Sequence, residues 1–61
     1  MTNVEKALYV LQELDLLLME KNIQKQQTDS PEVKEFLTNK MDAIDWARNM
    51  MIKEIARKDD R

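Results

Sequence analysis

The stretch TDSPE, residues 28–32, decides the fold because it separates two long helix-forming segments. Ser30 is a favourable N-cap residue, Pro31 suits the first turn of a helix, and Glu32 carries a negative charge where the helix dipole favours one. Pro31 also disfavours helical geometry at the residue before it. We therefore expect one helix to end before this stretch and a second helix to begin at its proline.

Upstream of this break, a helix is predicted over residues 3–26. Thr2 is placed as its N-cap and Glu5 at its third position, which are the two members of a reciprocal capping box. Apolar side chains then recur at spacings of three and four along one helical face. They are Val4, Ala7, Leu8, Leu11, Leu14 and Leu18. The pattern fades after Ile23, and a polar loop is expected over residues 27–30.

Downstream of the break, a second helix is predicted over residues 31–57, and residues 58–61 are expected to fray. Its apolar positions have the same spacing. They are Val33, Phe36, Leu37, Ala43, Ile44, Ala47, Met50, Met51 and Ile55. Two helices of about 25 residues joined by a short polar loop predict an all-α fold, an antiparallel two-helix hairpin that forms one domain over residues 1–61.

The composition leaves few ways to stabilise so short a chain. A single-chain core is marginal at 61 residues. The chain has no Cys and no His, which excludes disulfides and zinc sites built from thiolates or imidazoles. Association with another chain is the remedy that remains. Cysteine absence fits a cytoplasmic location, and neither a signal peptide nor an apolar run of about 20 residues is seen.

Both helices carry more apolar surface than one neighbouring helix can cover. The apolar arc of the first helix extends over roughly 200°, wider than the stripe of an ordinary amphipathic helix. We therefore expect two hairpins to dimerise into a four-helix bundle. The residues expected at the dimer or partner interface are Val10, Leu14, Leu17, Ala43, Trp46 and Met50. Tyr9, Leu16 and Ile23 form a separate stripe, seven residues apart, which is the better candidate for binding an external protein, although a packed dimer could also use it.

Two charged residues interrupt the apolar arcs. Asp15 lies in the arc of the first helix and Lys40 in that of the second. In a hairpin that turns near Thr28 the two residues should lie level, so we predict a contact between them, within one hairpin or across the dimer. Such a pair would add little stability but would fix the register. The alternative is that Lys40 extends its ammonium to water and Asp15 lies at the edge of its arc.

The sequence contains little that could perform catalysis. There is no His, Cys or Gly, and Ser30 is better explained as a cap than as a nucleophile. Carboxylates occur at helical spacing, at Glu32 and Glu35 and at Asp42 and Asp45, but they fall on the polar face among lysine and threonine. We expect no enzyme activity, no metal and no cofactor.

Charge and layout together lead to the functional prediction. The net charge of −2, with acids and bases well mixed, argues against a dedicated nucleic-acid surface, and Glu5, Glu13 and Glu20 argue against anionic membranes. The chain resembles the small regulators of bacteria, phages and plasmids, so we expect it to bind a larger protein, such as a transcription factor. In length and layout the hairpin also resembles the plasmid-encoded Rop hairpin, a homodimeric bundle that binds RNA. A Rop-like RNA or DNA binder and a purely structural oligomerisation module are therefore the alternatives.

Overall fold

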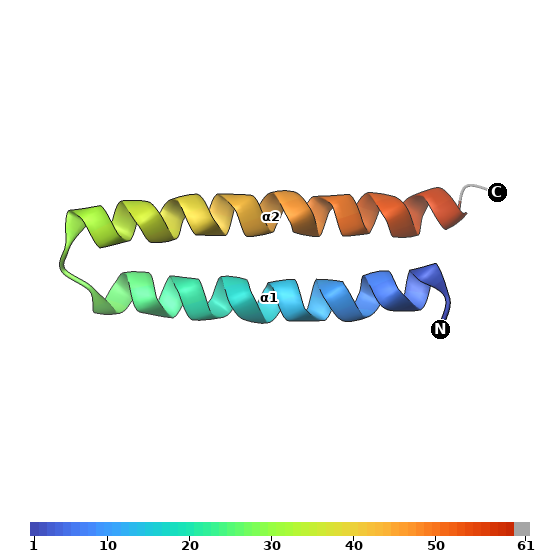
Figure 1. The fold of residues 1–61 in the computed structure, drawn as a ribbon, viewed down its shortest axis with the longest axis horizontal. Helices are drawn as coiled ribbons and strands as arrows, with labels where there is room; N and C mark the ends of the chain where they lie inside the picture. Colours follow the sequence, from blue (N-terminus) through green and yellow to red (C-terminus); the bar gives the residue numbers. More distant parts are fainter. Residues whose placement is uncertain (60–61) are drawn as a thin grey trace.

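The computed structural model describes residues 1–59, with side chains through residue 57, and consists of two helices. Helix α1 (Asn3–Gln27) and helix α2 (Pro31–Asp59) run antiparallel, side by side along their whole lengths (Figure 1). The N-terminus lies beside the far end of α2. The predicted all-helical hairpin is confirmed.

The helix bounds lie within two residues of the predicted ranges, which are approximate. Helix α1 ends at Gln27 rather than at residue 26, and α2 continues to Asp59 rather than to residue 57. Residues 58–61 are predicted to fray. Of these, residues 60 and 61 lie outside the described residues.

Helix α1 begins with the predicted capping box. The Glu5 N–H donates to Thr2 Oγ1 at 3.1 Å, and the Thr2 N–H donates to Glu5 Oε1 at 2.8 Å. The Lys6 N–H makes the first helical bond to the Thr2 carbonyl at 3.0 Å. Two N–H groups at the start of the chain, which a helix leaves without backbone partners, are thereby satisfied.

The turn between the helices is held by two hydroxyl groups. Thr28 has extended backbone angles (φ −102°, ψ 144°), and its Oγ1 accepts a hydrogen bond from the Ser30 N–H at 3.3 Å. Ser30 then caps α2, because its Oγ accepts from the Val33 N–H at 3.3 Å and its carbonyl from the Lys34 N–H at 3.0 Å. The break at Pro31 therefore has the local chemistry that its sequence indicated.

Each helix contributes a line of inward-facing side chains spaced alternately by three and four residues, the spacing of a coiled-coil seam. We call the two lines together the seam. Its residues on α1 are Val4, Ala7, Leu11, Leu14, Leu18, Lys21 and Lys25. Its residues on α2 are Leu37, Met41, Ile44, Arg48, Met51 and Ile55. Among the side chains that the structure describes, only Ala7 and Leu37 are buried, each with 4% exposure.

The hairpin is a single layer. Its principal extents are 48 × 16 × 11 Å, so its thickness is that of one helix. The radius of gyration is 14.3 Å, whereas a compact domain of this length would have about 10.5 Å. Globular domains usually bury their cores between two packed layers. Each helix here has a neighbour on one side only, which leaves its other sides exposed.

The capping box predicts a pH dependence confined to the start of α1. The Thr2 N–H, and secondarily the Thr2 side chain, hydrogen-bond the Glu5 carboxylate and hold the pKa of Glu5 below its ordinary value of 4.5. Because the pKa is lower in the folded state, this contribution to stability is present above pH 4.5 and is lost as the pH falls through the lowered pKa. The protection factors of the first-turn amides, which correct for the slower intrinsic exchange in acid, should therefore decrease at acidic pH in the native chain. Glu5→Gln keeps the hydrogen bond without the titration, so an identical acid response in this variant would contradict the assignment.

Candidate protein-binding surfaces

The exposed apolar residues are divided between the two sides of the layer. Successive helical residues are about 100° apart, so the residues before and after each seam position project to opposite sides. An antiparallel helix pair has an approximate two-fold axis perpendicular to its layer. Residues just before a seam position therefore share one side in both helices, and residues just after it share the other.

The first side is the more apolar. We call it the Val10 face, and its apolar residues are Val10, Leu17, Phe36, Ala43, Ala47 and Met50. All six except the half-buried Ala47 are exposed, and Phe36 retains 59% of its accessible surface. Four of them, Val10, Leu17, Ala43 and Met50, were predicted as interface residues from the sequence. The structure brings these four to one side of the hairpin.

The second side, which we call the Asp15 face, is acidic. Residues that follow seam positions include four carboxylates: Glu5, Asp15, Asp42 and Asp45. Its exposed large apolar side chains are Leu8, Met19 and Ile52. Apolar surface is therefore sparser here and interspersed with negative charge.

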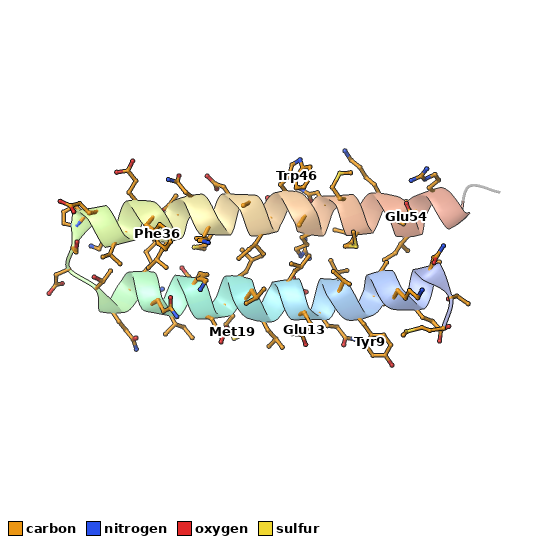
Figure 2. All side chains as sticks on the ribbon, viewed as in Figure 1. Tyr9, Glu13, Met19, Phe36, Trp46 and Glu54 are labelled. Atoms are coloured by element: carbon orange, nitrogen blue, oxygen red, sulfur yellow. The ribbon has the colours of Figure 1, made fainter. Side chains whose placement is uncertain are left out.

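The remaining two predicted interface residues lie elsewhere. Leu14 belongs to the seam and is half-buried between the helices. Trp46 projects from the edge of α2 that is turned away from α1, and it retains 66% of its surface (Figure 2). Neither residue is on the Val10 face.

The predicted partner-binding stripe is exposed along the opposite edge of the molecule. Tyr9 points away from α2 (Figure 2) and is 61% exposed, and Leu16 and Ile23 follow it at intervals of seven residues. We call these three residues the Tyr9 stripe. An open hollow lined by Glu5, Leu8, Tyr9 and Gln12 adjoins its N-terminal end.

Within the hairpin, Asp15 is not paired with Lys40. Arg48 Nε donates to Asp15 Oδ1 at 2.6 Å, and Lys40 Nζ lies 5.3 Å from the centroid of the Phe36 ring. Asp15 follows a seam position and Lys40 precedes one, so their side chains leave the layer on opposite sides. The intra-hairpin form of the predicted register pair is therefore corrected to Asp15–Arg48, while a contact across a dimer stays a prediction.

The sequence analysis did not identify Arg48 as a seam residue or Phe36 as a surface residue. Arg48 occupies a seam position between Ile44 and Met51. Its place in the alternating spacing was the signal that could have identified it. Phe36 was assigned to the apolar arc of its helix, and no local signal distinguished it from its neighbour Leu37, which the seam takes instead.

Comparisons with known proteins add no assignment. No protein-family model, curated protein or solved structure matches the chain. Among the side chains described, those of residues 1–57, no three or more carboxylates gather closely enough to hold a metal ion. Neither helix, over its described residues, is long and apolar enough to cross a membrane.

A double-mutant cycle tests the Asp15–Arg48 pair. Both side chains are substantially exposed, at 52% and 36%, so the coupling free energy between Asp15→Asn and Arg48→Gln should lie below about 1 kcal/mol and decrease with added salt. Thermal unfolding followed by circular dichroism measures it. The matched cycle of Asp15→Asn with Lys40→Gln should show no coupling. Stronger coupling in this second cycle would contradict the pairing described here.

Proposed function

We propose that this chain is a non-enzymatic interaction module that self-associates into a four-helix bundle and binds another protein through the Tyr9 stripe. The observation that carries the proposal is the position of this stripe. Tyr9 is exposed on the edge of α1 that faces away from α2 (Figure 2), and the exposed Leu16 and Ile23 share this edge because they follow at intervals of seven residues. They contribute nothing to the packing of the hairpin, so an external protein is the natural ligand for them.

The geometry of the stripe fits a helical ligand. Tyr9, Leu16 and Ile23 lie two turns apart along α1, a line of about 21 Å at 1.5 Å per residue. An amphipathic helix of a partner protein presents apolar side chains over such a length. Glu13 also projects from this edge (Figure 2), and Glu20 follows it seven residues later. The expected ligand is therefore a helix with an apolar stripe and basic flanking residues, while phosphate groups are disfavoured.

Self-association is supported by the small core. With only Ala7 and Leu37 buried among the described side chains, the hairpin hides little apolar surface from water. A second layer would cover what the single layer leaves exposed. The chain has no disulfide to compensate for a small core.

The proposed role is regulatory. A module of this size changes the activity of a larger protein, such as a transcription factor, by occupying one of its surfaces. We expect it to act in the cytoplasm of a bacterial or phage-infected cell.

Affinity capture with paired variants tests the proposal. The native chain and Tyr9→Ala/Leu16→Ala are used as bait in a lysate of the source organism. Truncating two exposed apolar anchors should remove the captured protein, because such residues carry most of the binding free energy. Helicity by circular dichroism should stay unchanged, since neither side chain packs in the seam.

A second pair of exposed apolar residues supplies the control. Trp46→Ala/Ile52→Ala removes a similar apolar area from α2 and should leave capture intact. Capture should also persist at raised salt, whereas phosphate contacts weaken steeply with salt. Equal capture by both double variants, or a captured nucleic acid that elutes with salt, would contradict the proposal.

A further inference from the structure

We infer that a second copy of this chain packs on the Val10 face, with α2 of one copy antiparallel to and directly against α2 of the other. This inference rests on the self-association proposed above and specifies its surface and direction. It leaves the Tyr9 stripe, on the outer edge of α1, accessible in the assembled bundle.

The exposed area is suited to such a dimer. One hairpin exposes 4975 Å², whereas a compact protein of its mass would expose about 4,200 Å². A compact protein of twice this mass would expose about 6,900 Å². Joining two hairpins into one such body would bury roughly 3,000 Å² in total, within the range of obligate homodimers.

Charge distinguishes the two sides as contact surfaces. In a two-fold contact through the Asp15 face, the carboxylates of both copies would be brought together, and the Arg48 of each copy already pairs with its own Asp15. Like charges at an interface oppose association. The Val10 face instead combines apolar residues with charges of both signs, Lys40 and Glu54 on α2 and Lys6, Glu13 and Glu20 on α1. Its two lysines offset two of its three carboxylates, so a second copy meets less repulsion there than on the Asp15 face.

The order of residues along α2 fixes the direction. The positions that precede seam residues are, in order, Phe36, Lys40, Ala43, Ala47, Met50 and Glu54. Small residues occupy the middle and large ones the ends. When a second α2 runs antiparallel about the midpoint, Ala43 meets Ala47 of the second copy and Ala47 meets Ala43. Two small side chains then face each other, which permits a close approach of the helices.

The same register pairs the charged ends. Lys40 comes opposite Met50 of the second copy, and its Glu54 is displaced from Lys40 by one turn, about 6 Å along the helix axis. Glu54 Oε2 already accepts a hydrogen bond from Arg57 at 2.6 Å, and its other carboxylate oxygen can accept Lys40. In the same register Phe36, whose ring lies 5.3 Å from Lys40 Nζ, comes opposite Glu54 of the second copy and one turn from its Met50.

Disulfide trapping tests the arrangement in a chain that has no cysteine of its own. Ala43→Cys and Ala47→Cys are prepared separately, mixed and oxidised mildly. We expect the mixed disulfide to form faster than either self-disulfide, because only that pair lies opposite in the proposed register. If α2 instead packed on α1 of the second copy, Ala43→Cys would couple best with Leu17→Cys, and this result would overturn the inference.

Charge insertion tests the face independently of cross-linking. Ala43→Glu would bury an unpaired carboxylate and should raise the dimer dissociation constant by on the order of 100-fold, as measured by sedimentation. Asn49→Glu, on the acidic side, is the matched control and should leave the constant nearly unchanged. If the native chain is a dimer but Asn49→Glu disrupts it and Ala43→Glu does not, the inference is overturned while self-association stands. If the native chain is a monomer, both fail.

Discussion

The structure depends on one constraint, which is that two helices in a single layer can cover only one stripe of each other. The seam uses a narrow line of alternating three- and four-residue spacing on each helix. Everything apolar outside that line remains in contact with water, including Tyr9, Phe36 and Trp46. The proposed second copy on the Val10 face and the proposed partner helix on the Tyr9 stripe are both consequences of this geometry.

The seam is uneven along its length, and its polar members matter for specificity. On α1 it changes from leucines to Lys21 and Lys25 toward the turn, and on α2 it is interrupted by Arg48. The Arg48 side chain extends from the seam toward the Asp15 face, where its Nε donates a hydrogen bond to Asp15. An exposed pair of this kind contributes little stability, but it favours one relative position of the two helices. The start of α1 and the turn between the helices are stabilised by local hydrogen bonds, in the capping box at Thr2 and at the hydroxyl groups of Thr28 and Ser30.

The helix ends could be predicted from the sequence, but the rotation of each helix about its own axis could not. The break at Pro31 and the capping box of Thr2 and Glu5 depend only on neighbouring residues, so both could be predicted. The choice of the seam within a wide apolar arc depends on how each helix is turned about its axis. A rotation by one residue exchanges Leu37, which is buried, with Phe36, which is exposed. The same ambiguity placed Asp15 and Lys40 in facing apolar arcs, whereas in the structure they lie on opposite sides of the layer and Asp15 pairs with Arg48.

The dependence of thermal unfolding on chain concentration shows most directly whether the hairpin needs a second layer. A hairpin that needs a second layer should unfold at a lower temperature when diluted, by roughly 5–10 °C over a hundredfold range, because dissociation and unfolding are linked by mass action. Circular dichroism at 222 nm, read in cells of different path length, measures this shift. A cooperative transition at the same temperature throughout that range would show that one hairpin is stable alone. It would contradict the need for a second layer.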